Sequence, residues 1–208
     1  MSDRIIPFTY NVKANKQRAF PLFFTVLLVS SVLVVLSMVV EKYSGLVSLG
    51  AVVGLTASVM IYQRYITSDY GYVVTDGGED NAVFLVTKRI GKRSSTMAYL
   101  PLYAVTSIQK FTKEELKQHK SDKTAKRYNF APTFGPDFVY IVFAKTPNGD
   151  FELVLECIPE VVDRLLEYSR YAKEDEMARR AAEEEEDEEY SDDYADDYSD
   201  TNDVSNGE

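Results

Sequence analysis

The sequence predicts an α+β protein: an N-terminal transmembrane helical hairpin, a bent antiparallel β-sheet closed by one C-terminal helix, and a disordered acidic tail. Three observations predict this order. Two long uncharged runs lie near the N-terminus, turn-separated segments rich in Val, Tyr and Phe follow them, and nearly half of the last 35 residues are acidic. We therefore divide the chain into an N-terminal segment (1–19), the hairpin (20–62), a β domain (69–173) and the tail (174–208).

The first uncharged run, from Phe20 to Val40, is 21 residues long. As an α-helix it extends over about 31 Å, which matches a hydrocarbon core about 30 Å thick. A cleaved signal peptide is the alternative interpretation, because basic residues precede the run. The apolar core of a signal peptide has only about 7–15 residues and ends at a small-residue cleavage site. The sequence before Glu41 offers no such site, so the run (20–40) is interpreted as a transmembrane helix.

The second uncharged run, from Ser44 to Tyr62, follows after three residues, and this short connection predicts two antiparallel helices (20–40 and 44–62). Gly50, Gly54 and Ser58 recur at every fourth position and therefore share one face of the second helix. Small residues at this spacing let two helices approach closely in a membrane. We interpret them as a helix-packing face against the first helix of the same chain. Homo-oligomerisation through the second span is the alternative.

Lys and Arg residues flank both outer ends of the hairpin, whereas its connecting loop holds a single cation, Lys42, beside Glu41. Cytoplasmic flanks of membrane helices are enriched in Lys and Arg. The sequence therefore predicts a multi-pass protein of the cell membrane with its N-terminus and C-terminus in the cytoplasm.

The β domain is predicted from β-prone segments separated by turn residues. The expected strands are residues 70–75, 82–90, 94–100, 104–111, 138–145 and 150–157, with a short strand at 127–130. Asn148-Gly149 is a strong hairpin turn pair, and Thr112 with Glu115 matches a capping box at the start of a short helix.

Pro159 suits the first position of the closing helix. Val161, Val162, Leu165 and Leu166 are expected to form one buried stripe, and the helix is expected to end between residues 171 and 180. Beyond it, Glu174 to Glu208 holds 17 acidic and two basic residues, whereas the rest of the chain carries a net charge of +5. The tail lacks the apolar residues that bury a core, and disorder is therefore predicted.

Several short motifs of the β domain support a resemblance to a known family. They are Tyr70 to Val73, Thr75 to Gly77, Lys88 to Arg93, and Ile158 to Glu160 before the last helix. With the two-helix hairpin, they resemble the membrane-tethered bacterial PH-like proteins. More narrowly, the chain is similar to a family of small two-span proteins of unknown function from Gram-positive bacteria. The resemblance covers about residues 20–171 and implies a PH-like cytoplasmic domain, but no established activity.

Lys88, Arg89, Lys92 and Arg93 surround one predicted turn, and the domain begins a few residues after the second span. Each basic residue held near an anionic bilayer contributes about 1 kcal/mol of attraction. We hypothesise that these four residues contact anionic lipid; a solvated hairpin tip is the alternative. Nucleic acid is not expected as a partner, because the patch is small and the tail repels phosphate.

The sequence lacks glycine-rich phosphate-binding loops, a nucleophile elbow and a zinc-binding His-Glu motif. The only histidine, His119, is interpreted as a surface residue, and the only cysteine, Cys157, as a small buried residue. We therefore predict no catalytic residues, no metal site and no cofactor. The expected function is that of a membrane-anchored, non-catalytic binding or scaffold protein, whose protein partner the sequence does not identify. An accessory subunit acting through its transmembrane helices is the second hypothesis, and an undetected membrane enzyme is the third.

Overall fold

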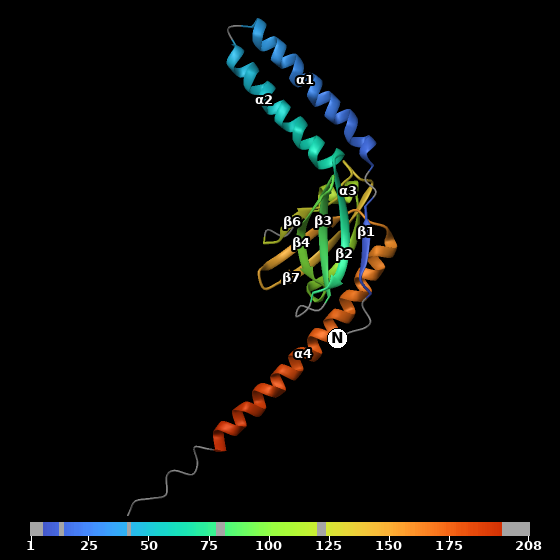
Figure 1. The fold of residues 1–208 in the computed structure, drawn as a ribbon, viewed down its shortest axis with the longest axis vertical. Helices are drawn as coiled ribbons and strands as arrows, with labels where there is room; N and C mark the ends of the chain where they lie inside the picture. The colour runs from blue at the N-terminus through green and yellow to red at the C-terminus, as the bar shows by residue number, and fades with distance from the viewer. Residues whose placement is uncertain (1–5, 13–14, 41–42, 78–81, 120–123, 197–208) are drawn as a thin grey trace, which may run out of the picture.

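The computed structural model describes residues 6–12, 15–40, 43–77, 82–119 and 124–196 of the 208-residue chain. Figure 1 shows an elongated α+β molecule with a pair of antiparallel helices at one end and a β domain in the middle. A long final helix passes along the domain and projects from the other end.

The helical hairpin consists of α1 (Ala19–Val39) and α2 (Ser44–Ile61), and α2 continues into a π-helical turn, η3 (Tyr62–Ile66). These bounds agree with the predicted helices to within one residue. Both helices are long and apolar enough to cross a membrane. In the most apolar 18-residue stretch of each helix, only 6% of α1 and 11% of α2 is buried inside the protein. Neither helix is therefore a core helix of the β domain. Helices that expose apolar side chains all round are typical of an apolar environment.

The first sheet has the order β1-β2-β3-β4 and is antiparallel throughout. Its strands are β1 (Phe8–Asn11), β2 (Ser68–Asp76), β3 (Ala82–Ile90) and β4 (Arg93–Pro101). The β3–β4 turn places Gly91 at φ +59°, a conformation that glycine adopts without a steric penalty. β1 lies in the N-terminal segment, for which no strand is predicted from the sequence.

The second sheet has the order β5-β7-β8-β6. Its strands are β5 (Val105–Thr112), β6 (Lys126–Asn129), β7 (Phe138–Thr146) and β8 (Gly149–Leu155), and the 3₁₀ turn η5 (Leu102–Ala104) leads into it from β4. The expectation of a purely antiparallel sheet is wrong here, because β6 pairs with β8 in parallel. Between β5 and β6 lies α3 (Lys113–Gln118), whose start has the predicted capping box of Thr112 and Glu115.

The main core lies between the two sheets and includes Tyr72, Phe84 and Leu155, each no more than 1% exposed. The last helix, α4 (Pro159–Asp196), packs on this core next to η5 and β1. Its buried side chains are Val161, Val162, Leu165, Tyr168 and Ala172. Leu166, expected in the same stripe, is 41% exposed. Adjacent positions in a helix point about 100° apart, and only Leu165 of this pair faces the sheets.

The helix α4 continues to Asp196, beyond the predicted end between residues 171 and 180. The predicted disordered tail is therefore helical as far as Asp196, and residues 197–208 lie outside the described residues. Ala, Glu and Arg are strong helix formers, and ion pairs between successive turns add to their preference. Glu176 forms two of these pairs, at 2.8 Å with both Arg179 and Arg180.

Candidate membrane-facing surface

Two neighbouring strands of the first sheet flank the helical hairpin in the chain, β1 before it and β2 after it. β1 leads through a short turn, η1 (Lys16–Arg18), into α1, and α2 leads through η3 into β2. β1 and β2 pair antiparallel, from Phe8 opposite Val74 to Asn11 opposite Gly71. The hairpin therefore occupies the place of a turn between two paired strands, and two connections attach it to the β domain.

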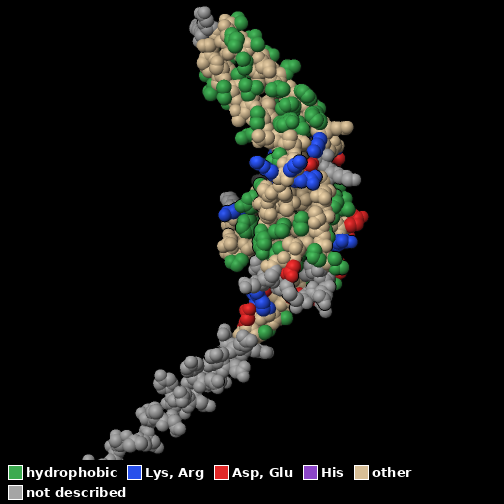
Figure 2. Space-filling view, viewed as in Figure 1, with side chains coloured by type: hydrophobic (Ala, Val, Ile, Leu, Met, Phe, Trp, Pro, Cys, Tyr) green, Lys and Arg blue, Asp and Glu red, His purple; other side chains and the backbone are tan. Residues whose placement is uncertain are grey.

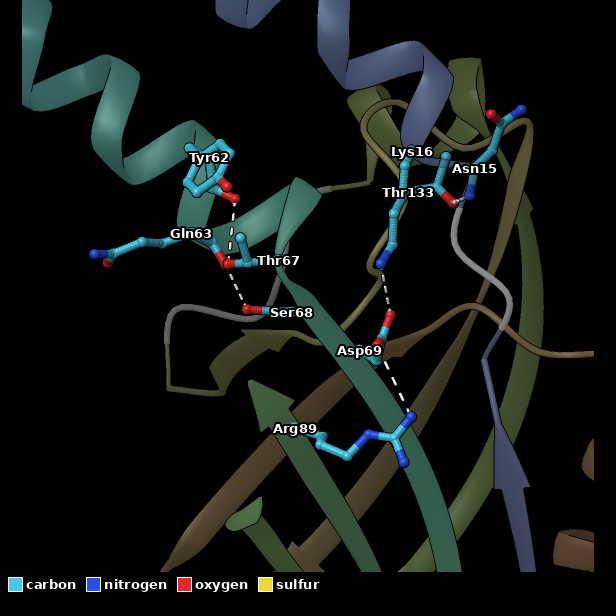
Figure 3. A network of polar contacts seen from close by, with 9 residues as sticks. All are labelled: Asn15, Lys16, Tyr62, Gln63, Thr67, Ser68, Asp69, Arg89 and Thr133. Carbon is cyan, nitrogen blue, oxygen red and sulfur yellow. Dashed lines mark hydrogen bonds and ion pairs between the residues drawn. The ribbon is translucent and has the colours of Figure 1, made fainter. Parts of the chain in front are cut away.

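An aspartate at the start of β2 links both connections to the next strand. One oxygen of Asp69 lies 2.9 Å from Lys16 Nζ, and the other lies 4.0 Å from a guanidinium nitrogen of Arg89 at the end of β3. Figure 3 shows Asp69 between these two cations. All three side chains are partly exposed, so each pair contributes at most about 1 kcal/mol. The pairs orient the connections more than they stabilise the fold.

The passage from η3 into β2 contains no flexible linker. The backbone N–H of Thr67 donates to the Tyr62 carbonyl at 3.0 Å, and the Thr67 hydroxyl donates to the Gln63 carbonyl at 3.1 Å. The hydroxyl of Ser68, a fully buried residue, donates to the same Gln63 carbonyl, as Figure 3 shows. These bonds satisfy the last carbonyls of the helix and hold the first residue of β2 against it.

The other connection is held by the loop of residues 131–137. Two guanidinium nitrogens of Arg18 donate to the two carboxylate oxygens of Asp137 at 2.9 and 2.8 Å, a bidentate arrangement. This ion pair lowers the pKa of Asp137 below its usual value. One turn earlier, the backbone N–H of Asn15 donates to the Thr133 hydroxyl at 3.0 Å. Residues nearly 120 positions apart thus meet at the start of α1.

The four predicted lipid-contact residues lie at the hairpin end of the β domain. Ile90 pairs with Ser68, the first residue after the helices, so the turn that joins β3 to β4 is next to the hairpin. Around this turn Arg89, Lys92 and Arg93 are exposed and Lys88 is half-buried. In Figure 2, Lys and Arg side chains gather at the boundary between the domain and the hairpin. We name this boundary the cationic collar and define it as Lys16, Arg64, Lys88, Arg89, Lys92 and Arg93.

The predicted helix-packing face of α2 lies against α1. A Cβ atom on Gly54 would overlap the hydroxyl of Ser30, and one on Gly50 would lie 3.7 Å from Leu33. Ser30 and Ser58 are almost completely buried, at 1% and 2% exposed. The small residues therefore serve the contact within the chain, where they let the two helix backbones approach closely.

The structure places His119 differently from its sequence interpretation. Its side chain is only 21% exposed, and its ring lies 4.9 Å from that of Phe111. Its Nε2 lies 3.4 Å from one oxygen of the buried Glu152, whose other oxygen is 3.6 Å from Nε of Arg127. His119 is thus held in the outer face of the second sheet. Asp150 and Glu152 lie two positions apart on β8, and this spacing predicts a polar face of the strand. The spacing does not predict that His119 lies beside Glu152.

A polar depression with a volume of about 550 Å³ lies beside His119 and Glu152. The Glu152 carboxylate has Arg127 as an ion-pair partner and the His119 ring within 3.4 Å, both from the chain's own fold. In the part of the chain that the structure describes, no three His, Cys, Asp or Glu side chains are grouped to hold a metal ion. Cys157 is buried, which raises the pKa of its thiol to about 12 and keeps it protonated at neutral pH. A protonated thiol is a poor nucleophile.

Comparison with protein-family models, with curated proteins and with solved structures finds no match to this chain. The resemblance to bacterial PH-like proteins therefore stays a prediction. The candidate surface is defined by the geometry of the described residues alone.

Proposed function

We propose that this chain is a membrane-anchored, non-catalytic binding or scaffold protein that presents a PH-like β domain at the cytoplasmic face of the cell membrane. The double connection between the hairpin and the domain carries this proposal. A single flexible linker would let the domain adopt many orientations. Two paired strands that continue into two helices hold one end of the domain toward the bilayer and present its sides to the cytoplasm.

The charges at the domain end of the hairpin support the proposed orientation. Lys16, Arg18 and Arg64 lie where the helices leave the domain, as cytoplasmic flanks require. The Nε atom of Arg64 is buried and has no acceptor among the described residues. Another nitrogen of the same guanidinium donates to the Asn129 carbonyl at 3.1 Å, which holds Arg64 at the domain end of the hairpin. Both termini then lie in the cytoplasm, because β1 and α4 belong to the same domain.

Contact between the collar and anionic lipid is part of the proposal. Lys88, Arg89, Lys92 and Arg93 lie around a turn beside the hairpin, and Asp69 is the only carboxylate in an ion pair with any of them among the described residues. Ile90 is exposed between them, so an apolar side chain accompanies the cations at the surface. Cations with an exposed apolar residue are typical of surfaces that bind the headgroup region.

The proposal is tested by measuring which end of the domain lies at the bilayer. Fluorophores are attached at Lys92→Cys or at Asp76→Cys, in a Cys157→Ala background and with the full chain in vesicles that contain quencher lipids. These sites lie at opposite ends of the first sheet, roughly 25 Å apart along the strands. We expect strong quenching at position 92, more with anionic than with neutral lipid, and little quenching at position 76. Equal quenching at both positions would contradict the fixed orientation.

One observation favours the second candidate, an accessory subunit that acts through its helices. The outer face of α1 has an apolar depression of about 350 Å³, lined by Leu28, Ser31, Val32, Val35 and Leu36. A helix of another membrane protein would fit against such a surface. Replacing residues 19–61 by an unrelated two-span hairpin distinguishes the two functions, because it keeps β1, η1 and η3 and therefore both connections. A binding module retains its partner after this exchange, and an accessory subunit loses it.

A further inference from the structure

The two sheets of the β domain leave an opening between β4, the last strand of the first sheet, and β6, the last strand of the second. The opening is a groove of about 230 Å³, which we name the β4–β6 groove. Its floor contains Leu100, Phe130 and Leu153, which are buried. Its rim consists of Met97, Tyr99 and Tyr128, which are 50%, 52% and 44% exposed. Figure 2 shows hydrophobic side chains on this side of the domain.

The outer edge of β4 has no strand beside it in the described part of the chain. The strand is nine residues long, and Arg93 at its start is its only charged residue. Edge strands of soluble proteins are usually protected by interior charges, prolines, bulges or short length. β4 has one irregularity in its pairing with β3, and its proline is at the end, so these protections leave most of its length able to pair with another strand.

The size of the groove indicates what kind of ligand fits it. Sites for small molecules commonly enclose about 300–1,000 Å³. A volume of about 230 Å³ is smaller and suits one or two large apolar side chains. An extended peptide supplies such side chains from alternate positions, while its backbone forms hydrogen bonds with the strand edge.

The charge around the groove favours acidic residues beside those apolar side chains. No carboxylate is among the described residues that line it. Arg93 lies at one end of β4, and the exposed Lys126 lies two positions before Tyr128, on the same face of β6. Complementary charges increase the association rate and select among partners more than they add affinity.

A second copy of the chain fits this edge less well than a partner segment. β2 runs away from the hairpin, and β4 has the same direction, because two antiparallel pairings relate them. In a second copy anchored in the same membrane, β4 would also run away from the bilayer. Two β4 strands are then restricted to parallel pairing, whereas a mobile peptide can pair antiparallel, which is slightly more stable per residue.

We propose that the β4–β6 groove binds an extended segment of a partner protein, in which apolar residues alternate and acidic residues flank them, and that this segment adds as a strand to β4. This inference rests on the proposed function, because it specifies which kind of partner binds to the side of the anchored β domain. In the orientation proposed above, the groove lies at the side of the domain, away from the bilayer.

The experiment uses the full chain in lipid nanodiscs and a phage-displayed library of random linear peptides of about 12 residues, with empty nanodiscs for counter-selection. Enriched peptides are measured against the wild type, Met97→Glu and the matched control Met177→Glu, which changes an exposed methionine of α4. We expect enriched peptides to alternate apolar residues between acidic ones. The Met97→Glu variant should bind them about tenfold more weakly, and the control should bind them as the wild type does.

Amide hydrogen exchange identifies the occupant and also detects a misfolded variant. We expect the bound peptide to slow exchange in residues 93–101. The proposal is wrong if no peptide is enriched, if Met97→Glu binds as well as the control, or if protection appears elsewhere. Two further results would contradict the proposal. If removal of residues 197–208 speeds up amide exchange in residues 93–101, the occupant of the groove is the chain's own end. If exchange there slows as the protein density in the membrane rises, the occupant is a second copy of the chain. None of these results alters the quenching at position 92, so the two proposals fail independently.

Discussion

The two sheets of the β domain meet at a side that α4 covers and at a second side, the β4–β6 groove, that no helix or strand of the described residues covers. At the first, α4 places Val161, Leu165 and Tyr168 on the core and leaves each less than a tenth exposed. At the second, the β4–β6 groove leaves Met97 and Tyr99 about half exposed above a buried apolar floor. Both sides have apolar linings, but among the described residues only the first is filled by a helix of the chain. The first is therefore part of the core, and the second is the surface for which peptide binding is proposed above.

The largest expected effect is at the covered side. We expect Leu165→Ala to lower the free energy of unfolding by about 2–5 kcal/mol, because it removes a side chain that is only 2% exposed and leaves a cavity. Leu166→Ala is the matched control and should change it by less than about 0.5 kcal/mol, because Leu166 is 41% exposed and lies outside the core cluster. Denaturant unfolding of both variants in the same detergent measures the difference. Equal losses would show that α4 does not close the core as described.

The next effect concerns a buried tyrosine that joins the two sheets. The Tyr72 hydroxyl accepts from the backbone N–H of Glu156 at 3.0 Å and donates to the Phe130 carbonyl at 3.3 Å. Tyr72→Phe leaves both backbone groups without this partner, and we expect a loss of about 1–3 kcal/mol in unfolding free energy. Tyr128→Phe, on the groove rim, should cost less than about 0.5 kcal/mol. A large cost at Tyr128 would mean that the groove is as tightly closed as the core.

A pH-dependent effect is expected at Cys157, which precedes α4 and belongs to the main core. Burial raises the pKa of this thiol from 9.0 to about 12. Its contribution to stability is therefore fully present below pH 9 and is lost as pH rises from there toward 12. Relative to Cys157→Ala, the wild type should lose about 1 kcal/mol of unfolding free energy between pH 8 and pH 10. Parallel pH curves for the two proteins would show that the thiol is reached by solvent.

The smallest expected effect is on the open side. Met97→Ala should change the free energy of unfolding by less than about 0.5 kcal/mol, since half of this side chain is already in solvent. The same substitution should weaken binding of any peptide selected on the groove. Unfolding and peptide binding are measured on the same preparation. A stability loss close to that of Leu165→Ala would remove the distinction between the two sides.

Local sequence signals predicted those elements that depend on residues close together in the chain. Length and hydropathy predict α1 and α2, the Asn148-Gly149 pair predicts the turn between β7 and β8, and Pro159 marks the start of α4. The sequence prediction ends α4 too early, because the acidic composition after residue 173 indicates disorder, whereas its Ala, Glu and Arg residues favour a helix. The stripe on α4 was predicted with one wrong member, Leu166, since spacing alone does not show which neighbour faces the core.

The candidate site depends more on contacts between distant residues. The four basic residues of the β3–β4 turn could be identified from the sequence, but their place beside the hairpin follows from the pairing of Ile90 with Ser68. β1 has only four residues, too few for a periodic signal, and it forms because β2 offers it an edge. His119 was assigned to the surface because its partner, Glu152, is 33 positions away.

The sequence by itself determined the two long apolar helices, most strands of the β domain and the absence of familiar catalytic motifs, because each follows from a short stretch of side chains. Only the tertiary structure decided that β1 joins β2, that β6 runs parallel to β8, and that the groove beside β4 is open. Such features depend on contacts between residues that are far apart in the chain, as in the hydrogen bond between Asn15 and Thr133, which are 118 positions apart. Long-range contacts of this kind are determined by the packing of the whole core and cannot be predicted from a local sequence pattern.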